Sequence, residues 1–155
     1  MEFKKVVDLP EGLTYSAIED AVKEFVKDSH TEETHADPVG LFQQTLEVMA
    51  SVVVNKSDQS QCWLAHENGE VFCYVLAHVS KDVDNKWCYW ITQAWVNKKI
   101  RGKKEVKEWY QQLRQEAKRL QCSHIIVPSS RGVEAYLRFL GKGWHLYLTL
   151  LKEDI

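Results

Sequence analysis

The spacing of hydrophobic positions changes several times along the chain, and each change marks a predicted element. Residues 2–8 are predicted to form a short strand. Ser16 followed by Glu19 matches a capping box, and apolar residues then recur at helical spacing. Asp37 and Pro38 form a typical helix start and open a second helix. We expect the buried face of this second helix to consist of Val39, Phe42, Leu46, Met49 and Val53.

Residues 60–97 contain three strand-like runs separated by turn signals. In QCWLAHENGEVFCYVLAHV two runs meet at Asn68-Gly69, a dipeptide that favours a tight type I′ hairpin turn. The polar segment KDVDNK then leads into WCYWITQAWV, which is rich in aromatic and β-branched residues. The pattern predicts a three-strand antiparallel meander. Simple alternation along its third strand places Trp90 on one face and the other large side chains on the opposite face, namely Trp87, Tyr89, Ile91 and Trp95.

A long helix, a strand, a helix and a strand are expected after the meander. The long helix has one apolar face, made of Val106, Trp109 or Tyr110, Leu113, Ala117 and Leu120. SHIIVP is a short strand, SRGVEAYLRFLG a helix and GWHLYLTLL a final strand. A strand, a crossover helix and a further strand normally form a right-handed parallel pair. The sequence therefore predicts a single α+β domain over residues 1–155, with a mixed, mostly antiparallel central sheet and helices on both faces.

Composition narrows the class of protein. The chain has 155 residues and a formal net charge of −2, which suits one balanced globular domain. No apolar run is long enough to span a bilayer, and the N-terminal residues lack a signal-peptide pattern, so we expect a cytoplasmic protein without a membrane role. The widely spaced cysteines are expected to be buried free thiols. His30 and His35 lie in an acidic loop whose spacing does not favour a metal site, so no metal is expected.

One stretch is strongly basic. Residues 98–107 carry six positive charges, just where the long helix is expected to begin. A helix N-terminus is itself positive, so cations there are unfavourable unless an anion binds. We therefore favour an anion site over a merely solvated basic turn. Nucleic acid is disfavoured as the ligand, because the molecule as a whole is not basic.

The order of elements and two segments resemble the GNAT superfamily of N-acetyltransferases. KIRGKKEVKEWY is similar to the superfamily's diphosphate-binding loop, and VEAYLRFLGKGWHLYL to its closing helix and strand. The resemblance implies the acyl-CoA N-acyltransferase fold, with acetyl-CoA as the acyl donor and an amine as the acceptor. It also implies backbone N–H groups near Trp95 or Val96 that polarise the thioester carbonyl. The residues expected to contact the coenzyme are Arg101, Gly102, Lys103 and Lys104 at the phosphates, and Ser129 or Ser130 at the pantetheine arm.

The chain departs from that superfamily at positions that bear on activity. Lys104 and Val106 occupy loop positions where small residues are usual, and Phe139 stands where a proton-donating tyrosine is often found. Tyr136, one helical turn earlier, is the candidate to replace that tyrosine. The candidates for a general base are Glu70 and His78, with His124 a further one. Water-mediated deprotonation is the alternative.

Two functions from different classes remain. The first is an acyltransferase that moves an acetyl group from acetyl-CoA to an amine. The alternative is a catalytically inactive GNAT-fold protein with a binding or assembly role, because AYLRFLGKGW also resembles the closing segment of small GNAT-like phage proteins. The acceptor and the oligomeric state stay open, a homodimer included.

Overall fold

A computed structural model describes residues 1–29 and 37–127 of the chain. The helix and strand expected after residue 128 lie outside the described residues. Up to residue 127 the order of elements agrees with the prediction. In chain order they are β1 (Glu2–Lys5), α1 (Tyr15–Ser29), α2 (Pro38–Asn55), β2 (Ser60–Glu67), β3 (Glu70–Lys81), β4 (Trp87–Val96), the 3-10 turn η1 (Lys98–Ile100), α3 (Lys104–Arg119) and β5 (His124–Ile126).

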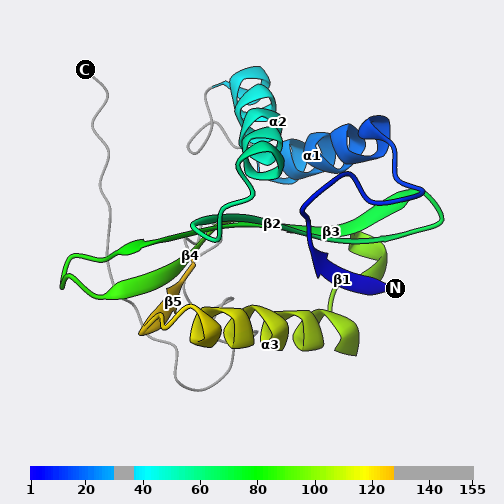
Figure 1. Cartoon of the computed structure of the whole chain (residues 1–155). Coiled ribbons are helices and arrows are strands. Elements are labelled where there is room, and N and C mark those ends of the chain that lie inside the picture. The colour runs from blue at the N-terminus through cyan, green and yellow to red at the C-terminus, as the bar shows by residue number, and fades with distance from the viewer. Residues whose placement is uncertain (30–36, 128–155) are drawn as a thin grey trace.

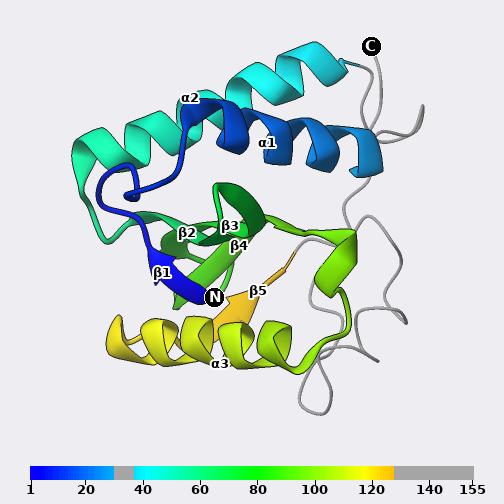
Figure 2. The ribbon, with the colours of Figure 1, turned by 90° about the vertical axis from the view of Figure 1, so that its right-hand side faces the viewer.

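The elements form three layers. The sheet has the order β1-β2-β3-β4-β5, in which the first four strands are antiparallel neighbours and β4 pairs with β5 in parallel. Helices α1 and α2 cover one face of this sheet, and α3 covers the other (Figures 1 and 2). The predicted fold class is therefore confirmed: a mixed, mostly antiparallel sheet with helices on both faces.

The helix starts agree with the sequence in one case and differ in the other. Asp37 caps α2 as expected, since its carboxylate accepts the backbone N–H of Gly40 at 2.9 Å. The predicted cap at Ser16 is wrong, because α1 already begins at Tyr15. Thr14 takes the capping role, with its hydroxyl accepting the N–H of Ala17 at 3.2 Å. A threonine immediately before the helix thus replaces the predicted box.

The buried face of α2 is rotated from the one expected. Val39 is exposed rather than buried, and the fully buried side chains of this helix are Thr45, Met49 and Val52. The predicted Phe42 is only partly buried. The polar Thr45 can lie at the centre of the buried face because its hydroxyl donates to the Leu41 carbonyl of the same helix.

A β-bulge in β4 changes which face its last residues occupy. Leu76 of β3 pairs with Gln93, whereas the next residue, Ala77, pairs with Ile91, so Thr92 is an extra residue on β4. The Thr92 hydroxyl donates to the Leu76 carbonyl at 3.2 Å. The prediction that Trp95 shares a face with Tyr89 and Ile91 is therefore wrong, because one inserted residue reverses the alternation that follows it.

Two apolar clusters fill the spaces on either side of the sheet. Trp95 packs on the α1–α2 side, where its ring stacks on that of Tyr74 with centroids 6.0 Å apart. Trp109 of α3 stacks on Phe3 of β1 on the opposite side. Four of the residues expected on the apolar face of α3 are buried, namely Val106, Trp109, Leu113 and Ala117. The fifth, Leu120, follows the end of the helix and is only partly buried.

The described cysteines are unpaired. Three are buried in the sheet and the fourth is partly buried, as the sequence predicted for free thiols. Burial raises the pKa of Cys62 to about 12 and that of Cys88 to about 11, so neither forms a thiolate at neutral pH. Within the described parts of the chain, no helix is both long and apolar enough to cross a membrane.

A polar network joins α3 to the sheet beneath it. The side chain of Gln61 is almost fully buried, and its carbonyl accepts from Tyr89 at 2.8 Å and from Trp63 at 3.1 Å. Its amide donates to Glu116 of α3 at 2.9 Å. Arg119 also binds Glu116, with N–O distances of 2.8 and 2.9 Å. Every polar atom of this buried glutamine therefore has a partner, which is the condition for a stabilising network.

Glu116 is ionised because of its neighbours. The hydrogen bond from Arg119 lowers the pKa of Glu116 most, against an opposing effect of burial, and Lys5 and Gln61 lower it further, to about 2. The folded-state pKa thus lies below the ordinary value of 4.5. A carboxyl group whose pKa is lower in the folded than in the unfolded state stabilises the fold when the pH is above the unfolded-state pKa. This stabilisation is lost as the pH falls towards the folded-state pKa.

We therefore expect Glu116→Gln to lower the free energy of unfolding at pH 7 by about 1–2 kcal/mol, less than the full pKa shift implies because Arg119 and Lys5 remain partly solvated. The variant should also lose part of the acid sensitivity between about pH 4.5 and 2. Urea unfolding across this pH range measures both effects. Glu108→Gln, an exposed change on the same helix, is the control. Parallel pH profiles for Glu116→Gln and the unsubstituted protein would contradict the assignment.

Candidate functional site

The edge of β4 that follows the bulge has no strand neighbour within the described residues. β5 pairs in parallel with β4 only from Cys88 to Trp90, before the bulge. Beyond it β4 continues to Val96, still paired with β3 on its other side. Among the described residues β5 ends at Ile126, opposite Trp90, so the C-terminal end of β4 has no strand on that side. Ligands commonly bind at such carboxyl ends, beside the helix that follows.

Backbone direction decides which groups of β4 face this open edge. The N–H of Asn97 donates to the Phe72 carbonyl of β3 at 2.8 Å. Because N–H directions alternate along a strand, the Val96 N–H and carbonyl face away from β3, towards the open edge, and the Trp95 groups face β3. Of the two predicted N–H donors, Val96 is therefore the better placed to meet a ligand there.

A tight loop connects β4 to α3. Asn97 closes its first part, because the side-chain carbonyl accepts the Lys99 N–H at 3.0 Å. The turn at Arg101 and Gly102 follows, and Gly102 has a φ of +79°. An added Cβ at Gly102 would meet no atom within 4 Å, so the glycine is required by backbone conformation rather than by space.

The N-terminus of α3 has no side-chain cap among the described residues. Its cap position is Lys103, whose side chain has no acceptor atom and makes no capping hydrogen bond. Helices α1 and α2 are both capped, by Thr14 and Asp37. The first turn of α3 therefore lacks a side-chain cap and lies beside lysines, with one acidic residue, Glu105. An uncapped helix start favours an anion.

The two unusual side chains of the loop do not fill the space above it. Val106 is buried and packs with Ile100 in the apolar cluster beneath α3. The Lys104 side chain is 88% exposed and extends to solvent. The departures from the small residues of related loops therefore place one side chain in the core and one in water.

Asp28, in the last turn of α1, binds two cations of the loop. Its carboxylate lies 2.7 Å from Arg101 Nη2 and 3.1 Å from Lys98 Nζ, with only 10% of the side chain exposed. Arg101 also donates from Nε to the Val96 carbonyl at 2.8 Å. Burial acts to raise the pKa of Asp28, but the hydrogen bonds from Arg101 and Lys98 outweigh it and lower the pKa overall. Asp28 is therefore ionised at neutral pH.

Glu70 supports the other side of the loop. Its carboxylate accepts from Lys99 Nζ at 2.8 and 3.1 Å and from the Asn97 side-chain amide at 3.2 Å. Lys104 pairs with the exposed Glu108 at 3.4 Å. Within the described part of the chain, the cations of the basic run without a carboxylate partner are Lys103 and Lys107.

The residues predicted as general-base candidates lie apart from one another. Glu70 begins β3, and His78 lies eight residues further along the same strand, roughly 25 Å away at the usual rise. His78 shares a weak contact of 3.4 Å with Ser60. His124 bonds to Asp82, which organises the β3–β4 turn by accepting the N–H groups of residues 84 and 86. These histidines do not join Glu70 at one site.

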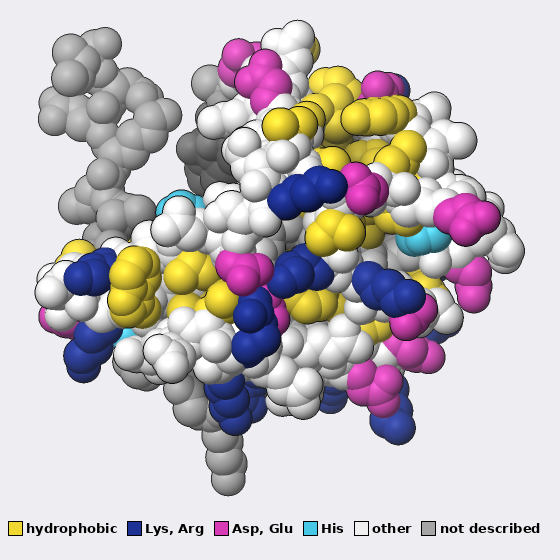
Figure 3. All heavy atoms as spheres, viewed as in Figure 1, with side chains coloured by type: hydrophobic (Ala, Val, Ile, Leu, Met, Phe, Trp, Pro, Cys, Tyr) yellow, Lys and Arg dark blue, Asp and Glu magenta, His cyan; other side chains and the backbone are white. Residues whose placement is uncertain are grey.

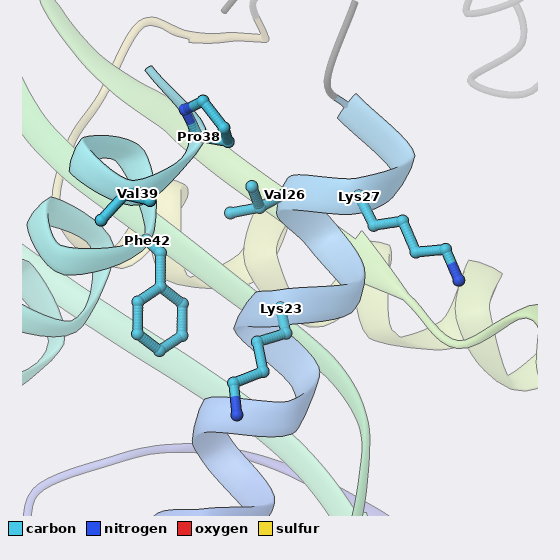
Figure 4. Close-up of a pocket in the computed structure, with 6 residues that line it drawn as sticks. All are labelled: Lys23, Val26, Lys27, Pro38, Val39 and Phe42. Carbon is cyan, nitrogen blue, oxygen red and sulfur yellow. The ribbon is translucent and has the colours of Figure 1, made fainter.

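Two hollows open on the side of α1 and α2. One of about 330 Å³ lies between α1, the start of β3 and the end of β4, and Asp20, Glu24, Glu70, Trp95 and Asn97 are among its lining residues. A second, of about 360 Å³, lies between α1 and α2 and is lined by Lys23, Val26, Lys27, Pro38, Val39 and Phe42 (Figure 4). The first adjoins the loop, and the second does not.

On one face of the molecule, charges of both signs are mixed. On the face seen in Figure 3, basic and acidic side chains alternate over the sheet and helices. No group of three or more metal-binding side chains occurs within residues 1–29 and 37–127. Three of the predicted site residues, Ser129, Ser130 and Tyr136, lie outside the described residues.

Two supporting residues were not predicted from the sequence. Asp28 contacts Arg101 of the loop, which lies 73 positions away in the sequence, so no local pattern could have predicted the pairing. Asn97 could have been found, because asparagine is a favoured cap immediately before a helical turn, and here it caps η1.

A family model identifies the class of protein. The family model for the acetyltransferase (GNAT) family matches residues 17–141, which is most of the chain. The chain therefore belongs to the acetyltransferase (GNAT) family. A comparison with curated protein sequences gave no match.

Solved structures agree in fold. A predicted acetyltransferase of Clostridium acetobutylicum, solved with acetyl-CoA, is 18% identical, with a TM-score of 0.67 over 99% of this chain and 95% of that one. An aminoglycoside antibiotic 6′-N-acetyltransferase of Acinetobacter haemolyticus is 13% identical, with a TM-score of 0.64 over 100% and 99% of the two chains. Glucosamine-6-phosphate N-acetyltransferase of Arabidopsis thaliana is 17% identical, with a TM-score of 0.62 over 99% of each chain.

The left-handed backbone of Gly102 gives a test of the loop geometry. Gly102→Ala should lower the free energy of unfolding by about 1 kcal/mol through backbone strain alone. Gly12→Ala is a matched control, because Gly12 has a φ of +77° and equally open space but lies outside the loop. Chemical unfolding of both variants should give similar losses. A much larger loss at Gly102 would mean that its surroundings are more crowded than the structure indicates.

Proposed function

We propose that the protein transfers an acetyl group from acetyl-CoA to an amine, with the coenzyme bound along the open edge of β4 and the loop that follows. The observation that carries the proposal is the uncapped, lysine-flanked start of α3 directly after that edge. Membership of the acetyltransferase (GNAT) family supports it independently. The acetyl-CoA complex of the Clostridium acetobutylicum neighbour supports the choice of donor.

The diphosphate of the coenzyme would lie at the start of α3. The N–H groups of the first helical turn donate to its oxygens, and the helix dipole adds a favourable potential. Gly102 gives the turn its shape, while Lys103 and Lys104 contribute exposed positive charge. The Ser129 or Ser130 hydroxyl is proposed to contact the pantetheine arm.

The thioester would lie further back along β4. Its carbonyl oxygen accepts from the Val96 N–H, which faces the open edge. The acceptor nitrogen attacks the carbonyl carbon, so that a C–N bond forms as the C–S bond breaks. A fixed N–H donor stabilises the negative charge that develops on the oxygen. The remaining rate enhancement comes from holding amine and thioester together.

The reaction requires two proton transfers. The amine must lose a proton, and the departing thiolate must gain one. The Glu70 carboxylate already accepts hydrogen bonds from Lys99 and the Asn97 amide, which hold it at the loop. Water is therefore the preferred route for the amine proton, and Tyr136 is the proposed donor to the thiolate.

Calorimetric titration with acetyl-CoA tests the coenzyme site directly. We expect the unsubstituted protein to bind acetyl-CoA, and Lys103→Ala/Lys104→Ala to bind it about tenfold more weakly, because two exposed contacts to phosphate are lost. The difference should shrink as salt screens the charges. Lys118→Ala removes a charge from the last turn of the same helix and should bind normally. Equal affinities for the double variant and the unsubstituted protein would remove the phosphate site from the start of α3.

The alternative function is a coenzyme-binding or assembly protein without catalysis. The specific observation in its favour is that no carboxylate or histidine occurs on β4 from Trp87 to Val96. Thiol release from acetyl-CoA, measured across a panel of amines, separates the two functions. Binding with no amine-dependent release would favour the inactive protein.

A further inference from the structure

We propose that Asp28 is a positioning residue for the coenzyme loop, acting through Arg101 rather than by touching the coenzyme. The proposal rests on the proposed function, since it concerns the loop assigned there to the diphosphate. It also changes the expected part of Arg101, from a phosphate ligand to the connection between α1 and the loop.

The contacts of Arg101 support this change of role. One guanidinium group joins two separate elements, with Nε on the Val96 carbonyl at 2.8 Å and Nη2 on Asp28 at 2.7 Å. The Val96 carbonyl faces the open edge of β4, so this bond closes the loop from its last strand residue back to Arg101. The guanidinium is thereby fixed within the protein.

Asp28 is the anchor of this arrangement. It lies in the last turn of α1, and its carboxylate binds both Arg101 and Lys98 while only 10% of the side chain is exposed. Both contacts are charge-assisted, and such bonds are stronger and more directional than neutral ones. The end of α1 is therefore tied to both the start of η1, at Lys98, and the residue that follows η1, Arg101.

A buried carboxylate beside a site for phosphates has two opposite effects. Its charge repels the bound anion, so removing the charge alone should strengthen binding. Its hydrogen bonds hold the loop in one shape, so removing them should weaken binding. The sign of the change in affinity therefore distinguishes a positioning role from a purely electrostatic one.

The experiment measures acetyl-CoA affinity by calorimetry for Asp28→Asn. We expect about tenfold weaker binding, because the amide cannot hold two cations as the carboxylate does. Asp20→Asn is the matched control: it removes the same charge from α1 at an exposed position that pairs with Lys23 of the same helix, at 3.8 Å. The control should bind as tightly as the unsubstituted protein or slightly more tightly. Asp28→Glu keeps the charge and should restore part of the lost affinity.

A double-variant cycle tests the route through Arg101. If Asp28 acts through Arg101, Asp28→Asn/Arg101→Gln should bind acetyl-CoA no more weakly than Arg101→Gln alone. Multiplying losses would instead indicate two independent effects and would overturn the proposal. Tighter or unchanged binding by Asp28→Asn would overturn it as well.

These outcomes are separable from a failure of the proposed function. If the unsubstituted protein does not bind acetyl-CoA at millimolar concentration, the coenzyme site and the role of Asp28 are both wrong. If it binds and Asp28→Asn is unaffected, only the role of Asp28 is wrong. Unfolding of Asp28→Asn in urea, compared with Asp20→Asn, separates lost affinity from a lost fold.

Discussion

The extra residue in β4 is the constraint on which the candidate site depends. Thr92 has no partner of its own on β3, yet its hydroxyl bonds to the Leu76 carbonyl and so keeps the bulge within the sheet. After the bulge, Trp95 changes to the α1–α2 face and packs on Tyr74. A bulge also bends and twists its strand. Within the described residues β4 pairs with β5 only as far as Trp90, before the bulge, and its last residues form the open edge that leads into the loop before α3.

The loop after β4 is basic in sequence, but carboxylates from other elements offset part of its charge. Asp28 of α1 pairs with both Arg101 and Lys98, and Glu70 of β3 pairs with Lys99. The run of positive charge is therefore not a uniform field that attracts any polyanion. What remains is local: the first turn of α3, which has exposed lysines and no side-chain cap. Such a site suits a compact anion such as a diphosphate better than an extended one.

Much of the fold could be predicted because its signals are local. Asn68-Gly69 has positive φ at both positions, as the expected turn requires, and Asp37 caps α2. The site was harder to predict because its determinants are not local. Nothing in the hydrophobic pattern indicates an inserted residue at Thr92, so the face of Trp95 was predicted wrongly. The contact of Asp28 with the loop depends on how α1 crosses the sheet, which only the packed structure defines.

The substitutions that set this loop apart from its relatives have different physical consequences. Val106 contributes its side chain to the cluster beneath α3, where a smaller residue would leave a cavity, so its size serves stability. Lys104 places its charge in solvent at the start of the helix, where it weakens the isolated helix and favours a bound anion. Gly102, the glycine that the backbone conformation requires, is retained. The two changed side chains, one in the core and one in solvent, therefore leave the shape of the loop unaltered at the place where we propose that the diphosphate binds.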